Sequence, residues 1–342
     1  MRIVHLILTR RFAGSERYAV ELANAQADAG HEVTMVLRRT ATEDRPDAIA
    51  HRLDSRVAVE TVGNLFVVSQ ARRVLRRLRP DVAHAHLNRA CMALHGLRGE
   101  CLRVSTLHIE YKPRRHGQLD ALIAIAPWQL DGIPEPLRHH TVQIDNWTQA
   151  VPASPDARER IRRDLGISMD AFVFGALGRI EHGKGLDVVV EAWRRAALPA
   201  DARLIVAGQG KAFDGIRKMA PAEVSMPGFV TKPQEWLAAF DVFVSAARRE
   251  PFGLVLLEAM NARLPILASA SEGARHLSDV IGTPLLPIGD IDALAAAMRS
   301  AHDTRMARRD YPMQRFDMAA RVADVEAFYR RELACIGLSA AQ

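Results

Sequence analysis

Residues 242–269 constrain the fold of this 342-residue chain more than any other stretch. The stretch begins at 242–244 with a short run of β-branched and aromatic side chains that is typical of a buried parallel strand. Residues 254–262 are strong helix formers without a helix breaker, and a second apolar run follows at 266–268. This order predicts a strand–helix–strand unit and therefore an α/β protein with a parallel sheet.

Two glutamates flank the start of the predicted helix. Glu250 lies in the preceding loop and Glu258 lies within the helix, with seven residues between them. The first N–H groups of a helix lack intrahelical partners and favour an anion such as a phosphate. We expect the Glu258 carboxylate to accept hydrogen bonds from vicinal hydroxyls, such as those of a ribose, and Glu250 to face the group attached beyond the phosphates. The alternative is that both glutamates are solvated residues at the flank of a helix.

A glycine-rich turn with two cations lies earlier in the chain. Residues 171–177 are apolar and predict a strand, and residues 186–197 predict the helix that follows it. The turn between them contains Gly178, Arg179, Lys184 and Gly185. Two fixed cations in such a turn stabilise the charge that develops on a pyrophosphate as its bond to another group breaks. Taken separately, each cation also fits a structural role.

These two segments resemble the retaining glycosyltransferases of family 4. The matching residues of the later segment are Glu250, Phe252, Gly253, Leu254, Glu258, Ala259, Met260 and Pro265. Those of the earlier segment are Gly178, Arg179, Lys184 and Gly185. The resemblance implies an α/β protein of the GT-B fold, in which two Rossmann-like, doubly wound domains face a central cleft and a C-terminal helix crosses back to the first domain. It extends over nearly the whole chain and is strongest at residues 171–271.

The resemblance also implies a set of site residues. The catalytic residues would be Glu250, His108, Lys184 and Arg179. The donor-binding residues would be Gly14, Gly178, Arg179, Lys184, Gly208, Phe229, Val230, Phe252, Gly253, Leu254 and Glu258. In the family's mechanism the arginine and the lysine hold the diphosphate of the donor. Glu258 holds its ribose, and Glu250 and His108 hold the transferred sugar.

The chain departs from the family pattern at several positions. Ala13 replaces the first glycine of a Gly-Gly-x-Glu turn, whereas Gly14 keeps the second. Only Asn146 is retained from a common Pro-Asn-Gly-Val-Asp stretch, and Gly273 is the one glycine kept from a pair near the phosphate. Arg263 stands where the helix before the next strand commonly ends in glycine. If the backbone there is left-handed, the arginine costs on the order of 1 kcal/mol.

The chain is long enough for two domains of about 150 residues each. We expect a Rossmann-like acceptor-binding domain at residues 1–150, a Rossmann-like nucleotide-sugar domain at 151–318, and a helix at 319–336 that packs back on the first domain. Residues 147–157 contain two prolines and predict the linker. Residues 284–286 predict the last strand of the second domain.

Three histidines end predicted strands of the first domain. Residues 81–86 predict a buried strand that ends in His84 and His86, which point to the same face. No third ligand is spaced to join them and no Asp-x-Asp pair lies in a strand-end loop, so we expect no metal site. His86 is expected to border the cleft. His108 ends the next predicted strand, residues 103–108, and the alternative to its sugar-binding role is a structural histidine.

The positive charge is concentrated in the first half of the chain. Residues 1–155 hold 21 Lys and Arg against 16 Asp and Glu, so they carry +5 of the net charge of +6. The densest cluster is Arg72, Arg73, Arg76, Arg77 and Arg79, on a predicted amphipathic helix. This helix predicts peripheral contact with an anionic membrane, and the alternative is a solvated arginine face. We expect no nucleic-acid partner, because the arginines lack aromatic neighbours and a binding motif.

The start of the chain and its cysteines predict a cytoplasmic protein. The apolar run at residues 3–8 is too short, and too soon followed by two arginines, for a signal peptide or a membrane span. Cys91, Cys101 and Cys335 are odd in number and lack ligand spacing, which fits reduced thiols. We therefore expect a cytoplasmic location, with association with the inner face of the plasma membrane if the arginine helix binds lipid.

The resemblance implies retaining transfer of a hexose or related sugar, without a metal or further cofactor. The donor would be a UDP- or GDP-sugar, and the acceptor a cell-envelope glycan or glycolipid, as in lipopolysaccharide or exopolysaccharide biosynthesis. One alternative is a noncatalytic nucleotide-sugar-binding or scaffold protein of a glycan assembly complex. Another is a GT-B nucleotide sugar epimerase or a phosphorylase. A dehydrogenase is disfavoured, because neither first strand–helix turn carries Gly-x-Gly-x-x-Gly followed by an acid at the next strand end.

Overall fold

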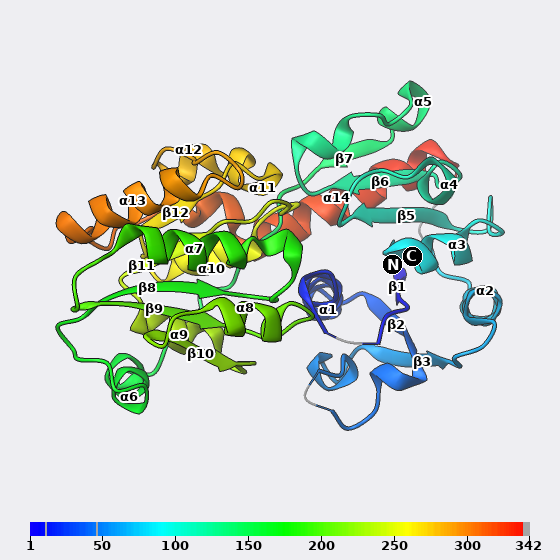
Figure 1. The fold of residues 1–342 in the computed structure, drawn as a ribbon. Helices are drawn as coiled ribbons and strands as arrows, with labels where there is room; N and C mark the ends of the chain where they lie inside the picture. Colours follow the sequence, from blue (N-terminus) through cyan, green and yellow to red (C-terminus); the bar gives the residue numbers. More distant parts are fainter. Residues whose placement is uncertain (11, 46, 338–342) are drawn as a thin grey trace. The chain divides into compact units, whose positions relative to one another are not determined.

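The computed structural model describes residues 1–10, 12–45 and 47–337, which form two compact units. The first unit consists of Met1–Trp147 together with the segment from Phe316 onward, and the second unit is Thr148–Arg315. The sequence prediction places these limits at residues 150 and 318. Each unit is built around one parallel sheet (Figure 1).

Within the described residues, seven parallel strands form the sheet of the first unit, in the order β3-β2-β1-β4-β5-β6-β7. The strands are β1 (Arg2–Ile7), β2 (Glu32–Arg38), β3 (Ala58–Val62), β4 (Val82–His86), β5 (Leu102–Leu107), β6 (Ala121–Ala124) and β7 (Thr141–Gln143). Strands β4, β5 and β6 are buried at every position, as expected for inner strands of a parallel sheet that is covered on both faces.

Helices cover this first sheet on both faces. They are α1 (Gly14–Asp28), α2 (Val67–Leu78), α3 (Asn88–Leu94), α4 (Pro113–His116), α5 (Glu135–Arg138) and α14 (Met318–Cys335). Three short 3-10 helices are η1 (Arg39–Ala41), η2 (Ala50–Arg52) and η3 (Pro127–Leu130). The last helix, red in Figure 1, contacts α1 and β5, so the two ends of the chain share one hydrophobic core.

Trp147 corrects the predicted linker. The indole is 2% exposed, stacks on the Tyr18 ring with 4.3 Å between centroids, and donates from Nε1 to Glu21 at 2.7 Å. Residue 147 therefore belongs to the core of the first unit rather than to a linker.

The second unit contains a smaller sheet of the same kind. Its described strands are β8 (Phe172–Leu177), β9 (Ala202–Ala207), β10 (Val224–Gly228), β11 (Val242–Ser245) and β12 (Ile266–Ala268), in the parallel order β10-β9-β8-β11-β12. The helices are α6 (Ala157–Asp164), α7 (Leu186–Ala196), α8 (Phe213–Met219), α9 (Pro233–Ala239), α10 (Leu254–Asn261), α11 (Glu272–His276), α12 (Ser278–Ile281) and α13 (Ile291–Asp303). A further 3-10 helix is η4 (His182–Lys184), and η5 (Met313–Phe316) lies at the boundary where the chain returns to the first unit. Helices α7 and α13 pack on each other over one face of the sheet.

The strand order positions the loops that matter for binding. β1 lies beside β4 in the first sheet, and β8 lies beside β11 in the second. The direction of winding reverses at each of these pairs, and loops at the carboxyl ends of such strands form the ligand crevice in open α/β sheets. In the second unit these loops are residues 178–185 and 246–253. They are the two segments that carry the family resemblance.

Two local predictions are incomplete or wrong. Strand β3 is absent from the sequence prediction, because its exposed edge residues give no apolar run. Residues 284–286 do not form a strand; they contribute a single parallel bridge, between Ser269 and Leu286. Pro284 and Pro287 flank this bridge and lack the N–H groups that a longer ladder needs.

Candidate active site

The two loops at the carboxyl ends of β8 and β11 are fastened to each other. The backbone N–H groups of Arg248 and Arg249 donate to the carbonyl of Gly183 at 2.9 and 3.1 Å. The Arg248 guanidinium forms a two-pronged pair with Asp187, at 2.7 and 2.6 Å, and donates to the carbonyl of His182 at 3.0 Å. The pair with Arg248 holds the pKa of the Asp187 carboxyl below its usual value. These contacts fix one loop against the other, and the sequence analysis missed both residues of the pair.

Two glycines permit close backbone contacts of the loop that follows β8. Gly185, at the start of α7, has φ 65°, and a Cβ there would lie 1.9 Å from the carbonyl oxygen of Ala246. Gly208 has φ 142°, and a Cβ there would lie 1.8 Å from the carbonyl oxygen of Gly178. Any larger residue would push the backbone apart. Gly185 and Gly208 therefore have a structural reason that is independent of a ligand.

Lys184 and Glu250 meet where the two loops join. Lys184 Nζ lies 2.5 Å from Glu250 Oε2, and the two side chains are 26% and 12% exposed. The backbone N–H of Glu250 donates to the Glu272 carboxylate at 3.2 Å, and its carbonyl accepts from Gly273 N–H at 2.7 Å. Residues of helix α11 thus fix the backbone of the predicted catalytic glutamate. Glu272 was not predicted, although it stands next to the one glycine kept from the family's pair.

The remaining predicted donor residues of the second unit lie around this pair. Gly253 has φ 101° and precedes α10, Leu254 is the first residue of that helix, and Glu258 is half-buried in its second turn. Phe252 is buried, whereas Phe229, just after β10, is 62% exposed. Val230 follows it and is half-buried. Arg179 is 61% exposed and pairs with Glu181 at 3.2 Å.

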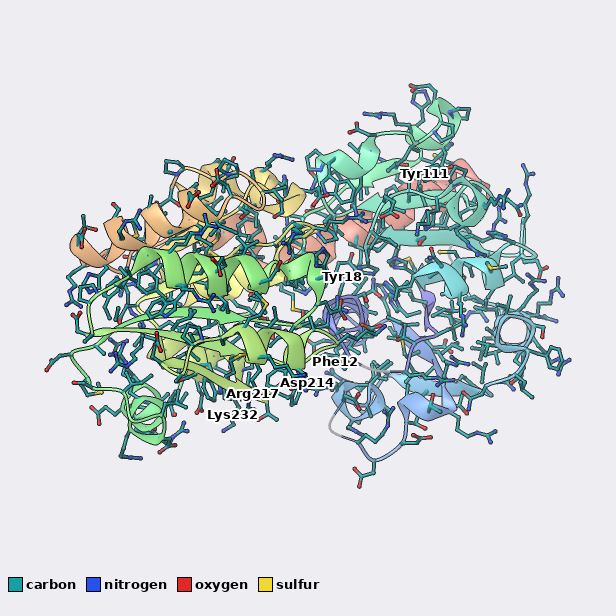
Figure 2. The ribbon with its side chains drawn as sticks, in the orientation of Figure 1. Phe12, Tyr18, Tyr111, Asp214, Arg217 and Lys232 are labelled. Carbon is teal, nitrogen blue, oxygen red and sulfur yellow. The ribbon has the colours of Figure 1, made fainter. Side chains whose placement is uncertain are left out.

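Helix α1 of the first unit begins at Gly14, as the resemblance implies. Its N-cap is Ala13, whose side chain makes no capping bond, so the first N–H groups of α1 are not satisfied by a cap. Tyr18, labelled in Figure 2, packs one turn further along the helix with its ring edge-on to His108 at 5.1 Å. Tyr18 therefore links helix α1, which begins at the predicted donor residue Gly14, to the predicted catalytic histidine.

A third histidine joins His84 and His86, contrary to the sequence prediction. The third histidine is His5 on β1, which lies opposite His84 on the neighbouring strand β4. Ring nitrogens of the three buried histidines lie within 4.8 Å of one another. Sequence spacing could not reveal this, because β1 and β4 are adjacent in space but distant along the chain. His86 is also fully buried in the sheet rather than at a border of a crevice.

The nitrogens of this cluster are occupied by hydrogen bonds. His84 bonds Tyr329 Oη at 2.5 Å through Nδ1 and Thr106 Oγ1 at 2.8 Å through Nε2. A metal ion could bind three histidines here only after such bonds were broken. The cluster therefore fits a polar network better than a metal centre.

A hydrogen-bonded chain leads from Gln26 to His108. Gln26 Oε1 accepts from His5 Nε2 at 2.7 Å, His5 Nδ1 lies 3.1 Å from His86 Nε2, and His86 Nδ1 lies 3.2 Å from His108 Nε2. A neutral imidazole has one donor and one acceptor nitrogen, so each bond sets the direction of the next. With Gln26 Oε1 as the acceptor, His108 donates from Nε2 and presents Nδ1 as an acceptor.

Burial keeps these histidines neutral. It lowers the pKa of His108 to about 3 and that of His5 to about 4, the latter partly offset by the hydrogen bond to Gln26. Burial, and then the neighbouring histidines, hold the pKa of His84 and of His86 well below the usual value. His108 is consequently a hydrogen-bonding group rather than a proton donor near neutral pH.

Two family models together match most of the chain. Residues 12–171 match the model described as Glycosyltransferase Family 4, and residues 171–303 match the model described as Glycosyl transferases group 1. The chain belongs to the family 4 glycosyltransferases. This confirms the family resemblance, and with it the prediction that the protein is a glycosyltransferase.

This family 4 glycosyltransferase has relatives over most of its length. The lipopolysaccharide core biosynthesis glycosyltransferase LpsE of Rhizobium meliloti is 27% identical over 327 residues, which are 91% of this chain and 93% of the relative. A D-inositol 3-phosphate glycosyltransferase of Pseudarthrobacter chlorophenolicus is 29% identical over 76% of this chain and 74% of the relative.

Solved structures confirm the GT-B fold. Anabaena HepE in complex with UDP-glucose has a TM-score of 0.76 at 19% identity and matches over 98% of this chain and 99% of that one. WaaG, a glycosyltransferase involved in lipopolysaccharide biosynthesis, has a TM-score of 0.67 at 18% identity over 98% of both chains. Among the described residues of this glycosyltransferase, no helix combines the length and the apolar character needed to cross a membrane.

Proposed function

We propose that this glycosyltransferase moves a sugar from a UDP- or GDP-linked donor to a cell-envelope saccharide, with retention of configuration and without a metal ion. The observation that carries the proposal is the pair of Lys184 and Glu250, fixed between the carboxyl ends of β8 and β11. HepE, a structural neighbour, is known in complex with UDP-glucose, which supports a nucleotide-sugar donor. The relative named for lipopolysaccharide core biosynthesis supports an envelope acceptor.

The second unit supplies the groups for the donor. A lysine ammonium has three N–H donors, so Lys184 can keep its bond to Glu250 and still donate to two phosphate oxygens. Arg179 would add a second cation to the diphosphate, and the first N–H groups of α10 would add a partial positive charge. Glu258 would accept from the ribose hydroxyls, and the backbone around Phe229 would meet the edge of the base.

The chemistry needs charge stabilisation more than a nucleophile. The bond between the anomeric carbon and the β-phosphate oxygen breaks, and the acceptor oxygen bonds to that carbon on the same face. The acceptor proton passes to the departing phosphate oxygen. Lys184 and Arg179 stabilise the negative charge on the leaving diphosphate, and Glu250 stabilises the positive charge on the sugar. His108, as a neutral acceptor at Nδ1, would orient a sugar hydroxyl.

Membrane contact through the first unit is a further part of the proposal. Arg72 turns toward α3, and Arg76 and Arg77 pair with carboxylates. Fewer arginines of α2 are therefore available to bind lipid than its sequence suggests. Leu65 and Phe66, directly before this helix, are 75% and 82% exposed and would insert among lipid headgroups. Flotation with phosphatidylglycerol vesicles tests this contact, and the absence of salt-sensitive binding would contradict it.

The donor proposal is tested by thermal unfolding in the presence of UDP-, GDP-, ADP- and CMP-sugars. We expect one class to raise the unfolding temperature of the wild-type protein, because a ligand that binds the folded state stabilises it. Lys184→Gln should lose this response. The matched control is Lys218→Gln, the same change at an exposed lysine on α8 of the same unit, which should keep it. Equal responses in the two variants, or none in the wild type, would overturn the proposal.

A further inference from the structure

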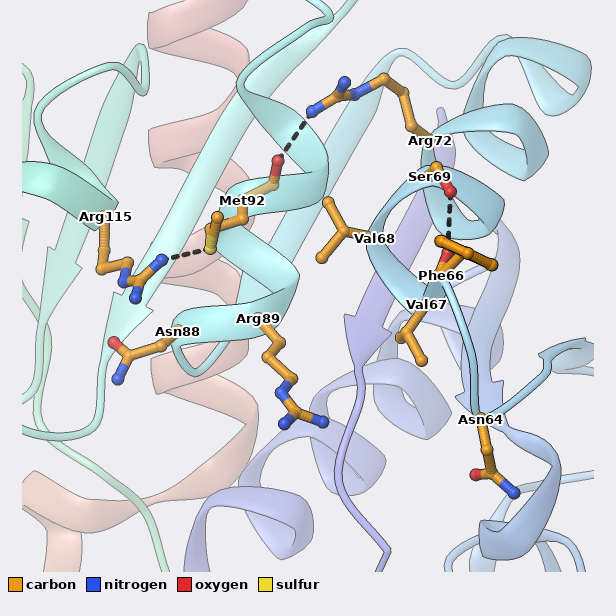
Figure 3. Close-up of a pocket in the computed structure, with 10 residues that line it drawn as sticks. All are labelled: Asn64, Phe66, Val67, Val68, Ser69, Arg72, Asn88, Arg89, Met92 and Arg115. Carbon is orange, nitrogen blue, oxygen red and sulfur yellow. Dashed lines mark hydrogen bonds between the residues drawn. The ribbon is translucent and has the colours of Figure 1, made fainter.

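A cavity of about 710 Å³ in the first unit gathers cations without acids. It lies between α2 and α3, and Figure 3 shows the side chain of Arg89, near the start of α3, among the lining residues. Its polar lining includes Arg72, Arg89, Arg115 and Asn64. None of its ten lining residues is an aspartate or a glutamate. Its charge is therefore not balanced within the cavity wall.

Two of these arginines, Arg72 and Arg115, contact other residues of the unit, whereas Arg89 has no such side-chain contact among the described residues. Arg72 donates to the carbonyls of Ala93 and Met92 at 3.1 and 2.9 Å and so closes the end of α3. Arg115 contacts the Met92 sulfur. Arg89 is exposed, and within the described part of the chain it has no carboxylate partner. Its guanidinium remains available to an anion.

A buried arginine stands behind the cavity. Arg38, at the end of β2, is 5% exposed and donates from Nη2 to the carbonyl of Asn64 at 3.1 Å. Its Nε is buried and has no hydrogen-bond partner among the described residues. A buried charge is costly unless it is paired and hydrogen-bonded. Desolvation, followed by the charges of Arg10 and Arg89, lowers the pKa of Arg38.

These arginines converge from separate strands at one edge of the sheet. Arg38 ends β2, Arg10 follows β1 and Arg89 follows β4, and no described acid pairs with any of them. The carboxyl edge of an open parallel sheet is where such folds bind ligands. Mutual repulsion among three guanidinium groups disfavours the free state and is relieved by a bound anion.

We propose that this cavity is an anion subsite that binds a phosphate or carboxylate group carried by the saccharide acceptor. The inference rests on the proposed transferase function and specifies the chemical class of its acceptor. Arg89 would supply a two-pronged contact to the anion, and Arg38, behind Asn64, would add positive charge near the cavity. Asn64 and Asn88 can hydrogen-bond sugar hydroxyls, and the 82% exposed Phe66 gives the cavity an apolar rim.

The test compares three matched sugars in a background where the donor site cannot compete. Glucose 6-phosphate, glucuronate and glucose are titrated into full-length Lys184→Gln protein, and the shift in unfolding temperature is followed. We expect both anions to bind and glucose to be without effect. Adding Arg89→Gln should raise the Kd for the anions about tenfold or more, because a charge-assisted contact is lost.

A second exposed arginine of the same unit supplies the control. Arg98→Gln removes the same charge outside the cavity lining and should leave the anion titration unchanged. Arg89→Lys should bind the anions more weakly than wild type and more tightly than Arg89→Gln, because the charge is kept and the two-pronged geometry is lost. Equal Kd values in Arg89→Gln and Arg98→Gln would overturn the proposal, as would equal binding of glucose and glucose 6-phosphate.

A lipid headgroup presents the same phosphate chemistry as the proposed acceptor. One further experiment distinguishes binding of a lipid from binding of a soluble saccharide. Vesicles of phosphatidylglycerol in phosphatidylcholine are floated with wild-type, Arg89→Gln and Arg98→Gln proteins. Vesicle binding that depends on Arg89, without any response to the soluble anions, would assign the cavity to a lipid and overturn the proposal. Arg89-dependent responses to the soluble anions support it.

The two proposals fail in distinguishable ways. If the transferase function is wrong, wild-type protein gives no response to any nucleotide sugar, whatever the anions do. If the anion subsite is wrong, a nucleotide sugar still stabilises wild-type protein, while no anion titration depends on Arg89.

Discussion

At the scale of single residues, the carboxylate of Glu250 lies beside Lys184. A neutral replacement tests what its charge contributes to sugar transfer. Glu250→Gln keeps the size and one oxygen acceptor of the side chain. We expect kcat for sugar transfer to fall by about 100-fold, because the developing positive charge on the sugar loses its partner. The unfolding temperature should change little.

Glu223→Gln is the matched control for this prediction. Glu223 is an exposed glutamate of the same unit and lies outside the predicted site. Its variant should transfer sugar at the wild-type rate. A Glu250→Gln protein with wild-type kcat would remove Glu250 from the proposed mechanism.

Arg263 is a residue at which the sequence predicts strain, and the structure confirms it. The backbone there has φ 61°, and the N–H groups of Arg263 and Leu264 donate to the carbonyls of Met260 and Ala259 at 2.8 and 3.0 Å. This is the hydrogen-bond pattern of a helix end that favours glycine. The arginine is partly compensated by an exposed ion pair with Asp310 at 2.7 Å.

We expect Arg263→Gly to be more stable than Arg263→Ala by about 1 kcal/mol, because both lose the ion pair and only glycine relieves the left-handed strain. Chemical unfolding of the two variants measures the difference. An alanine variant as stable as the glycine variant would show that the strained backbone costs nothing here.

At the scale of elements, histidines in and next to the strands of the first sheet make the stability of this unit depend on pH. His5 and His108 have pKa values of about 4 and 3 in the folded protein, whereas an unfolded histidine titrates near about 6.5. Between these values the unfolded chain binds protons that the folded unit does not. The folded unit is therefore at full stability above about pH 6.5 and loses stability as the pH falls.

We expect a loss on the order of 1.4 kcal/mol per pH unit for each buried histidine between about pH 6 and pH 5. Hydrogen exchange of β1 and β4 amides, read by mass spectrometry, follows this unit separately from the second one. His108→Gln should reduce the slope, whereas a change at the exposed His51, such as His51→Gln, should not. Exchange protection that is constant over this range would contradict the prediction.

The elements also show what sequence can and cannot predict. Strands β8, β9, β11 and β12 were predictable, because continuous apolar runs between glycine-rich turns have few alternatives in a soluble protein. Strand β3 was not, because an exposed edge strand lacks that pattern. Lys184 and Glu250 could be named from motifs, whereas the pair of Arg248 and Asp187 that fastens their loops could not.

The same limit applies to the buried polar groups of the first unit. His5, His86 and Gln26 come from three elements, and only the strand order brings them together. Arg38 and Arg89 are likewise brought near each other by the sheet rather than by sequence spacing. Contacts of this kind depend on which strands are neighbours, and periodicity along the chain does not carry that information.

At the scale of the whole molecule, Tyr329 on α14 ties the end of the chain to its beginning. Its hydroxyl lies 2.5 Å from Nδ1 of the buried His84. Tyr329→Phe keeps the ring and leaves this nitrogen without a partner. We expect the first unit to lose about 1–3 kcal/mol of stability, as measured by hydrogen exchange of β4 and β5.

Tyr111→Phe provides the comparison, because Tyr111, labelled in Figure 2, is half-buried in the same unit and its ring contacts His116 rather than the cluster of His5, His84 and His86. It should leave the exchange of β4 and β5 at the wild-type rate. A Tyr329→Phe protein with wild-type exchange would show that the hydroxyl adds nothing to the contact between α14 and the sheet.

The place of α14 in the first unit also sets an order of events during protein synthesis. The ribosome releases residues 1–147 early, but the core that these residues share with Val325, Phe328 and Tyr329 has to wait for the last helix. The second unit, Thr148–Arg315, is complete before that helix emerges. Residues 1–147 are therefore translated before the second unit, but their core is completed only after it.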